Sequence, residues 1–189
     1  MKLKKVDFWQ INLAHSKSAV DTLLSSVCKV QTKPIILIQE PYLYKGKIKL
    51  ALPNYKIYSS ESNSRAAVAI PQHFRSWNVP DLSDRDTATI ILEENDNDKY
   101  LVVSSYLDIQ HTPVVPQMLD KVHSFSDSTK TPIILGMDSN SHSTLWGCDE
   151  NNKRGEDLEE WILQHNLYVM NKGNVKTFVT KNGSSIIDI

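Results

Sequence analysis

The sequence predicts an α/β protein in which two β-sheets pack together and helices cover their outer faces. Two observations support this fold class. The chain begins with alternating strand-like and helix-like segments, a pattern typical of a crossover unit between parallel strands. A central series of strand-like segments, separated by turns rich in Asn, Asp, Ser and Pro, then indicates a second set of strands.

The N-terminal segment contains a strand, a helix and a second strand in that order. We expect the first strand over residues 4–13 and the second over residues 34–38. Either Ser16 or Ser18 opens the helix, and Ser18 and Asp21 have the spacing of a capping box. The apolar residues of this helix form one stripe: Ala19, Val20, Leu23, Leu24, Val27 and Val30.

The remaining elements follow from the same patterns. Strands are expected over residues 55–58, 66–70, 87–92 and 100–106, with a tight polar turn over 94–98. Helices are expected over residues 114–125 and 156–165, separated by a strand that runs into Asp138. Short strands are expected over residues 167–170, 176–179 and 185–189.

The composition indicates one ordinary globular domain over residues 1–189, with 40% hydrophobic and 23% charged residues. The formal net charge of −1 argues against a protein that coats DNA grooves, but not against an enzyme that contacts phosphates through local cations. Lys45, Lys47 and Lys49 form such a local cluster, which we treat as solvated surface unless the fold places it beside a site. Without a signal peptide or a long apolar span, an intracellular protein with no membrane partner is expected.

The most informative segment is PIILGMDSNSHSTLWG, residues 132–147. An apolar run is followed by Asp138, Asn140 and His142, which alternate with serines. In an extended chain this alternation places a carboxylate, an amide and an imidazole on one side. A carboxylate can deprotonate a water, and an amide can donate to a phosphate oxygen as negative charge builds there. The alternative is an Asx-rich turn whose side chains bond only their own backbone.

Polar residues also stand where other apolar runs end. Together with the segment above they form a set of six: Asn12, Glu40, Tyr106, Asp138, Asn140 and Asp188. Glu40 and Asp188 each follow an apolar run, and a buried carboxylate there is costly unless it is paired, protonated or bound to a metal. The alternative is that each is an exposed side chain at a strand end.

Several segments, taken in order, resemble one family: QINLAHS, ILIQEP, SRAAVAI, VVSSYLD, ILGMDSNSHSTLWG, NKRGEDLEEWI and SSIID. The chain resembles the endonuclease/exonuclease/phosphatase superfamily and, within it, most resembles the endonuclease domain of non-LTR (LINE-type) retrotransposons. The resemblance implies a four-layered α/β sandwich that hydrolyses a DNA phosphodiester with Mg²⁺, or with Mn²⁺ as an alternative. It also implies a nuclear enzyme whose nick leaves a 3′ hydroxyl as the primer for a reverse transcriptase domain downstream.

The resemblance also implies a role for each residue at a matching position. Glu40 would be the metal ligand, and Asn12 would support the metal or the phosphate. Tyr106 would donate a hydrogen bond to a phosphate oxygen. Asp138 would orient and deprotonate the attacking water, and Asn140 would stabilise the transition state.

The C-terminal segment departs from the family pattern. Asp188 would orient a catalytic histidine in a Ser-Asp-His motif, but the sequence ends at Ile189. We therefore expect a domain incomplete at its C-terminus, without the last strand, taken from a larger polyprotein.

Three further residues are candidates for contact with substrate. His15 and His142 are expected at the rim of the site. Arg65 either reaches the DNA backbone or forms a surface salt bridge. For Arg154-Gly155, before the last helix, a structural role in the turn is favoured.

The alternatives to an endonuclease are a phosphatase for a small phosphorylated substrate and an inactive remnant that binds nucleic acid.

Overall fold

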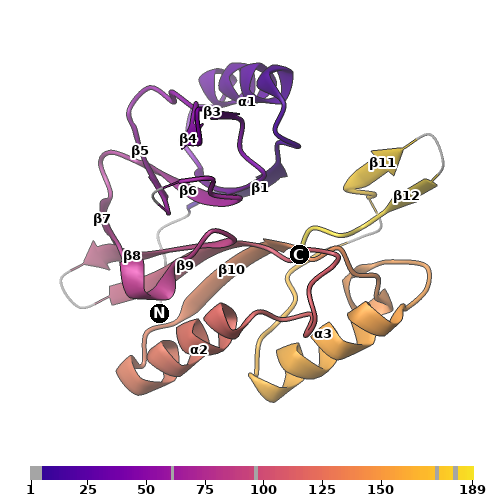
Figure 1. The fold of residues 1–189 in the computed structure, drawn as a ribbon. Coiled ribbons are helices and arrows are strands. Elements are labelled where there is room, and N and C mark those ends of the chain that lie inside the picture. The colour runs from indigo at the N-terminus through magenta and orange to yellow at the C-terminus, as the bar shows by residue number, and fades with distance from the viewer. Residues whose placement is uncertain (1–5, 61, 96–97, 173–174, 181–182) are drawn as a thin grey trace.

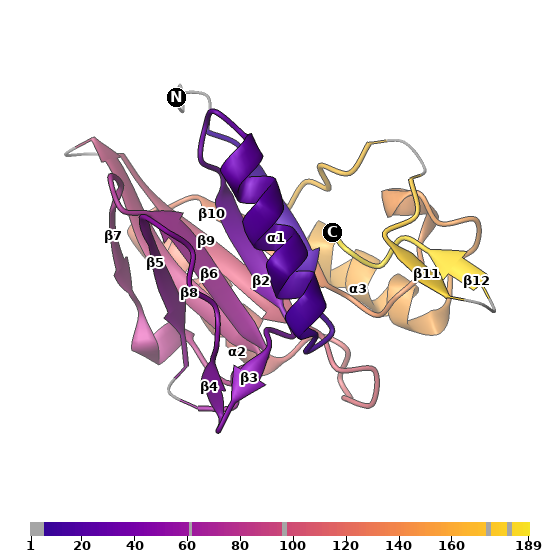
Figure 2. The same cartoon turned by 90° about the horizontal axis from the view of Figure 1, so that it is seen from above.

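The computed structural model describes residues 6–60, 62–95, 98–172, 175–180 and 183–189. Two four-stranded sheets pack face to face, with helix α1 outside one sheet and helices α2 and α3 outside the other (Figure 1). Seen from above, α1 (Lys17–Lys29) lies across the first sheet (Figure 2). The predicted four-layered α/β sandwich with two mixed sheets is therefore confirmed.

The first sheet has the strand order β1-β2-β6-β5. Its strands are β1 (Phe8–Asn12), β2 (Ile35–Gln39), β6 (Ala66–Pro71) and β5 (Tyr55–Ser59). β1 and β2 are parallel and are joined by α1, as the crossover pattern predicts, whereas β6 pairs antiparallel with both of its neighbours.

The second sheet has the strand order β10-β9-β8-β7. Its strands are β10 (Ile133–Asp138), β9 (Asp98–Tyr106), β8 (Thr87–Asn95) and β7 (Arg75–Asn78). β9 and β10 are parallel, and α2 (Gln117–Thr129) connects them. Residues 187–189 run antiparallel along the free edge of β10, where Asp138 and Asp188 face each other in a bridge.

The remaining elements are short. β3 (Leu43–Tyr44) pairs with β4 (Lys47–Ile48), and β11 (Phe178–Thr180) pairs with β12 (Gly183–Ser185). Two 3-10 turns span Pro80–Leu82 and Thr144–Trp146. No helix in the described part of the chain is both long and apolar enough to cross a membrane.

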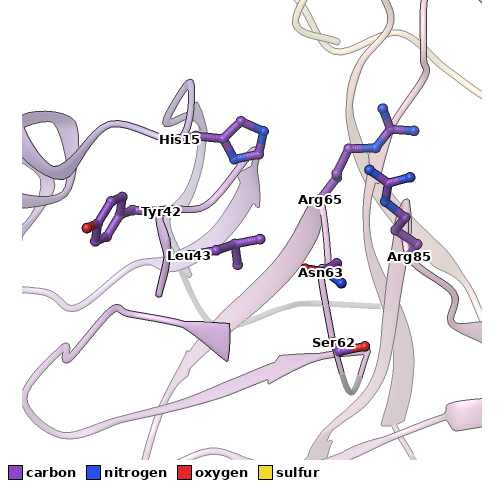
Figure 3. A pocket seen from close by; sticks show the side chains of 7 residues that line it. All are labelled: His15, Tyr42, Leu43, Ser62, Asn63, Arg65 and Arg85. Carbon is purple, nitrogen blue, oxygen red and sulfur yellow. The ribbon is translucent and has the colours of Figure 1, made fainter. Parts of the chain in front are cut away.

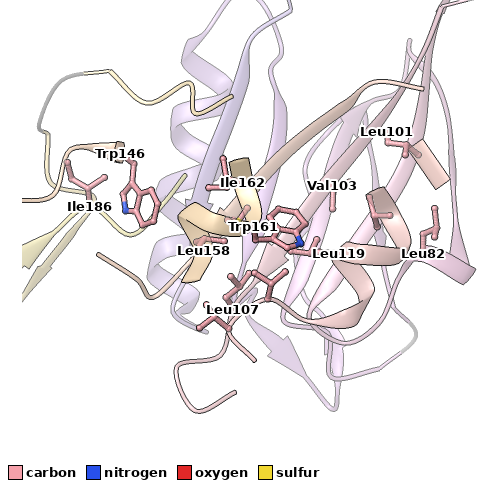
Figure 4. Close-up of a cluster of buried hydrophobic side chains, with 14 of the residues drawn as sticks. Leu82, Leu101, Val103, Leu107, Leu119, Trp146, Leu158, Trp161, Ile162 and Ile186 are labelled. Atoms are coloured by element: carbon pink, nitrogen blue, oxygen red, sulfur yellow. The ribbon is translucent and has the colours of Figure 1, made fainter. Parts of the chain in front are cut away.

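The pleat of the strands divides their side chains between the layers. In β2, Ile35 and Leu37 face the second sheet, whereas Ile36 and Ile38 face α1. The core between the sheets consists of Ile35, Leu37, Ala66, Val68, Ile70, Ala88, Ile90, Leu92, Tyr100 and Val102. A second cluster fills the space between the second sheet and helices α2 and α3, with Leu119, Leu158 and Trp161 among its members (Figure 4).

The helix starts differ from the predicted ones for identifiable reasons. Ser16 caps α1, with its Oγ accepting from the amide of Ala19 at 3.4 Å, so the predicted Ser18–Asp21 capping box is wrong. Pro116 precedes α2, and a proline disfavours helical geometry in the residue before it, so that helix begins at Gln117 rather than at residue 114. Asn152 caps α3 (Lys153–Gln164), which begins three residues earlier than expected.

Some predicted strands also differ. Residues 167–170 form no strand, because their alternation reflects contact of Leu167 and Val169 with the core rather than pairing with another strand. β3, β4 and β7 were not predicted from the sequence. Part of the turn expected over residues 94–98 lies outside the described residues.

Candidate active site

The side chains between the two sheets change from apolar to polar toward the carboxyl ends of the parallel strands. Four strands show this change: Phe8, Gln10, Asn12 in β1; Ile35, Leu37, Gln39 in β2; Tyr100, Val102, Ser104, Tyr106 in β9; and Ile134, Gly136, Asp138 in β10. Carboxyl ends of parallel strands meet at one edge of a sheet, where functional groups collect in α/β folds. The two sheets therefore bring their polar ends together.

Asn12 joins the two sheets at this polar end. Its Nδ2 donates to Glu40 Oε2 at 3.0 Å and to Asp138 Oδ2 at 2.5 Å. Its Oδ1 accepts from the amide of Ala14 at 2.7 Å, which fixes the orientation of the side-chain amide. The structure thus brings together three of the predicted site residues, which are far apart in the sequence.

The backbone around Glu40 is held in an uncommon conformation. Glu40 has a φ of 45°, in the left-handed region that residues other than glycine rarely adopt. Its amide donates to the carbonyl of Arg65 at 2.8 Å, and its carbonyl accepts from the amide of His15 at 2.8 Å. The His15 ring has Nδ1 at 3.0 Å from the Pro41 carbonyl and Nε2 at 3.4 Å from Glu40 Oε1. These contacts turn the Glu40 side chain toward the cluster and place His15 beside it.

Asp138 is a buried carboxyl group, with 2% of the residue exposed. Burial raises the pKa of Asp138 to about 6, and the charges of Asp188 and Glu40 add to this effect. The hydrogen bonds from Asn12 and from the amide of Asn140 act in the opposite direction. At neutral pH the group is therefore ionised, and it is a stronger base than an ordinary carboxylate.

The chain does not remain extended beyond Asp138. Asn140 has a φ of 46°, and its amide donates back to Asp138 Oδ1 at 3.3 Å. Its Nδ2 donates to the carbonyl of Leu107 at 3.1 Å. His142 is exposed, and both its amide and its carbonyl bond to Asn152. The predicted one-sided array of Asp138, Asn140 and His142 is wrong, because a turn separates the carboxylate from the imidazole.

Tyr106 lies at the end of β9, where it is paired in register with Asp138 of β10. Burial raises the pKa of its hydroxyl, as do the charges of Glu40 and Asp138. The guanidinium of Arg65 lies 4.7 Å from the centre of the tyrosine ring. Arg65 also donates two hydrogen bonds to Asp86, at 2.5 and 2.6 Å, and one to Asp108 at 2.6 Å. The salt bridge, which was one of the two alternatives for Arg65, is therefore present.

Asp188 lies next to Asp138 at the edge of β10. Burial raises its pKa, whereas hydrogen bonds from Thr177 and Gln10 lower it. Gln10 Nε2 donates to Asp188 Oδ1 at 3.3 Å and to the Met137 carbonyl at 2.8 Å. Gln10 was missed in the sequence, although its spacing of two from Asn12 on a strand places both side chains on one face.

Arg154 and Gly155 hold the loops that surround the cluster. The Arg154 guanidinium donates to the carbonyls of Asp108, Ile109 and His111, each at 3.1 Å, and to that of Asn140 at 3.3 Å. A Cβ atom at Gly155 would lie 1.8 Å from the carbonyl oxygen of His142, so only glycine fits there. The favoured structural role of this pair agrees with these contacts.

The cluster has the chemistry of a site for a hard cation. Among the described residues, no group of three or more His, Cys, Asp or Glu side chains forms a preformed metal cage. The carboxylates of Glu40 and Asp138 nevertheless both bond to the side-chain amide of Asn12. The atoms that these carboxylates can offer to a metal are all oxygens. Mg²⁺ is commonly held by one or two carboxylates and several waters, whereas zinc favours sulfur and nitrogen ligands. The residues present therefore fit Mg²⁺ better than zinc.

A cavity of about 650 Å³ lies beside the cluster. His15, Tyr42 and Leu43 form one wall, and Asn63, Arg65 and Arg85 form the other (Figure 3). His15 contacts Glu40, and Arg65 covers the ring of Tyr106, so the cavity adjoins the cluster on both sides. Neither Asn63 nor Arg85 was singled out in the sequence.

Comparison with solved structures places this fold in a known class. The chain shares its architecture with a mannosyl-6-phosphatase of Bacteroides thetaiotaomicron VPI-5482, with a TM-score of 0.53 and 13% identity over 82% of this chain and 70% of that one. An endonuclease/exonuclease/phosphatase family protein from Bacteroides thetaiotaomicron gives a TM-score of 0.50 and 13% identity over 82% and 68%. The chain has the endonuclease/exonuclease/phosphatase fold.

Within this class the similarity to retrotransposon proteins is stronger. The endonuclease domain of TRAS1, a telomere-specific non-LTR retrotransposon, has a TM-score of 0.78 and 23% identity, covering 95% of this chain and 81% of that one. Residues 100–189 match the model of a family described as endonuclease-reverse transcriptase. The 115 kDa protein of the type-1 retrotransposable element R1DM of Drosophila melanogaster is 24% identical in an alignment of 162 residues that covers 81% of this chain and 16% of that protein. The predicted resemblance to non-LTR retrotransposon endonucleases is confirmed.

Proposed function

We propose that this protein is a metal-dependent DNA endonuclease that cuts one strand and leaves a 3′ hydroxyl to prime reverse transcription. The observation that supports it best is the link from Glu40 through Asn12 to Asp138, which joins the polar ends of both sheets. The similarity to the TRAS1 endonuclease domain and to the R1DM protein favours DNA as the substrate. By the same similarity, a reverse transcriptase domain and action in the nucleus belong to the proposal.

Each residue of the cluster has a role in this reaction. Asp138 accepts the proton of the water that attacks the phosphorus atom, and Asn12 and the Asn140 amide hold the carboxylate in place. As the new bond forms, the bond from phosphorus to the 3′ oxygen breaks, and this oxygen takes a proton from solvent water to become the 3′ hydroxyl. Glu40 would hold Mg²⁺, or Mn²⁺ in its place, and Asn12 would support the ion by orienting the Glu40 carboxylate. When bound, such an ion supplies Lewis-acid polarisation of the phosphate.

Two further side chains stabilise the charge that develops on the phosphate oxygens. Tyr106 is paired in register with Asp138, and no described group forms a hydrogen bond with its hydroxyl. Asn140 uses one amide hydrogen on the Leu107 carbonyl, which leaves the second for the substrate. A donor that is already held in place, as the Asn140 amide is, lowers the barrier because it needs no reorganisation during the reaction.

The proposal is tested by incubating supercoiled plasmid with Mg²⁺ and the protein. We expect nicked circles whose ends a DNA polymerase can extend, since extension requires a 3′ hydroxyl. Asp138→Asn should lower the nicking rate by about 10²–10⁴-fold, as the loss of a general base typically does. The matched control is Asp127→Asn, at an exposed position of α2, which should nick at the wild-type rate.

Three results would contradict the proposal. Nicking that persists in excess EDTA would refute the metal requirement. Nicking by Asp138→Asn at the wild-type rate would refute the role of the cluster. Release of phosphate from a sugar phosphate, with no nicking of any DNA, would favour the phosphatase alternative, whose fold this chain also shares.

A further inference from the structure

We infer that the cavity beside the cluster is a subsite for a phosphate of the DNA backbone next to the cleaved bond, and that Arg85 binds this phosphate. The inference rests on the proposed function, because it specifies how the same site holds its substrate. It depends on a difference between the two arginines of one cavity wall (Figure 3).

Arg65 and Arg85 differ in whether their guanidinium groups are paired with carboxylates. The Arg65 side chain is only 14% exposed, and its guanidinium is already paired with Asp86 and Asp108. Arg85 is exposed, and no acceptor in the described part of the chain pairs with its guanidinium. Arg85 is therefore the cation on this wall that is available to a ligand.

The acidic neighbours of Arg85 in the sequence are engaged elsewhere. Asp84 Oδ1 accepts from the amides of Asp86 and Thr87, at 2.9 and 2.8 Å. The Asp86 carboxylate binds Arg65 through both of its oxygens. Two carboxylates that could neutralise Arg85 are thus held in the turn and in the ion pair, which keeps the guanidinium available.

The backbone of Arg85 is held beside that of Arg65. Its carbonyl accepts from the amide of Arg65 at 2.6 Å, so the two arginines are held on the same wall. Across the cavity lies His15, which contacts Glu40. A strand with one phosphate at the cluster can therefore place a neighbouring phosphate at Arg85.

The rim of the cavity adds further positive charge. Leu43, in β3, is part of the wall opposite Arg85, and the β3–β4 hairpin carries Lys45 and Lys47 as exposed side chains. The amide of Asn63 donates to the carbonyl of Gly46 at 2.8 Å, which ties this hairpin to the arginine wall. The fold thus places Lys45 and Lys47 on a hairpin that is bonded to the cavity wall, and a phosphodiester chain is the ligand that fits this charge.

Guanidinium groups suit this ligand because their planar donors match two phosphate oxygens at once. Contacts of this kind position the nucleic acid without reading its sequence. We therefore expect Arg85 to increase affinity for any DNA, with no dependence on the target sequence.

The test measures binding of a fluorescein-labelled 30-base-pair duplex by fluorescence anisotropy, in EDTA so that no cleavage occurs. Arg85→Gln should weaken binding about tenfold at 100 mM salt, the loss expected for one charged hydrogen-bonded contact. It should also reduce the slope of log affinity against log salt by about 0.9, the value for one phosphate contact. Arg85→Lys should retain the slope, because the charge is kept.

The matched control is Arg75→Gln, which removes the same charge from an arginine of β7 that is 67% exposed. It should change affinity by less than twofold. Equal weakening by both Gln variants, or wild-type binding by Arg85→Gln, would overturn the subsite. If the wild type nicks plasmid while Arg85→Gln binds normally, the inference fails and the proposed function stands. If binding depends on Arg85 but no plasmid is nicked, the function fails and the subsite stands.

Discussion

The interface between the two sheets has an apolar end and a polar end, built by the same strands. At the apolar end, Ile35, Ile90 and Val102 are completely buried among other hydrocarbon side chains. At the polar end, Asp138 is buried as a carboxyl group, and Glu40 and Asn140 have left-handed backbone conformations. The comparison teaches that the apolar end supplies most of the stability. The buried carboxyl group and the left-handed backbone conformations of the polar end cost stability, which indicates that they serve a function.

A short polar layer separates the two ends. Gln39 Nε2 donates to Ser104 Oγ at 2.9 Å, and Ser104 Oγ donates to the Ile38 carbonyl at 2.9 Å. Gly136 lets the sheets approach here, since a Cβ at this position would lie 2.5 Å from Leu37 Cδ1 and 2.9 Å from Gln10 Oε1. Hydrogen bonds across this layer fix the register of the two sheets, so the site residues of both sheets meet.

The largest expected effect is a loss of stability at the apolar end. Ile90→Ala should lower the free energy of unfolding by about 2–5 kcal/mol, because it removes buried apolar surface and leaves a cavity between the sheets. Urea unfolding followed by circular dichroism measures this. The rate of plasmid nicking per folded molecule should not change, since Ile90 belongs to the apolar core and pairs with Val102 and Asn78 rather than with a strand end of the cluster.

The matched control for this prediction is Ile109→Ala, at a position that is 62% exposed. Exposed substitutions of this kind usually change stability by less than about 0.5 kcal/mol. If both variants lost the same amount, the space between the sheets would not be the source of stability.

The sequence predicts most of the layered fold, because hydrophobic periodicity reports burial directly. It predicts β2 and β9 well, since their apolar runs are long. It fails at residues 167–170, where alternation arises from packing alone. At the site, Asn12, Glu40 and Asp138 could be found as polar residues at strand ends. The ion pairs of Arg65, the turn at Asn140 and the cavity at Arg85 depend on contacts between distant segments, which one sequence does not reveal.

A smaller effect of opposite sign is expected at the polar end. Because the pKa of Asp138 is raised from its ordinary value of 3.8 to about 6, the folded state binds a proton more tightly than the unfolded state. Stability from this group is therefore present below pH 4 and is lost as the pH rises to 6. Asp138→Asn removes the buried charge and should be about 1–2 kcal/mol more stable than the wild type at pH 7.5.

Urea unfolding at pH 4.5, 6 and 7.5 checks this prediction. The difference between Asp138→Asn and the wild type should grow with pH over this range and stay constant above it. The gain is partly offset because the new amide has one oxygen where the carboxylate accepted from both Asn12 and Asn140. A variant less stable than the wild type at pH 7.5 would show that these hydrogen bonds outweigh the buried charge.

The smallest expected effect comes from the ion that the polar end is proposed to bind. Mg²⁺ at ten times its dissociation constant stabilises a folded protein by about 1.4 kcal/mol, which raises the melting temperature by a few degrees in a chain of this size. Differential scanning fluorimetry at constant ionic strength, with KCl as the reference, separates this effect from screening. Glu40→Gln should lose the shift and Asp127→Asn should keep it.

The shift should also decrease below pH 6, because a proton on Asp138 removes one of the two charges that attract the cation. An equal shift in Glu40→Gln would place the ion outside the cluster and leave the buried Asp138 carboxylate and its neighbour Glu40 without a cation to offset their charges.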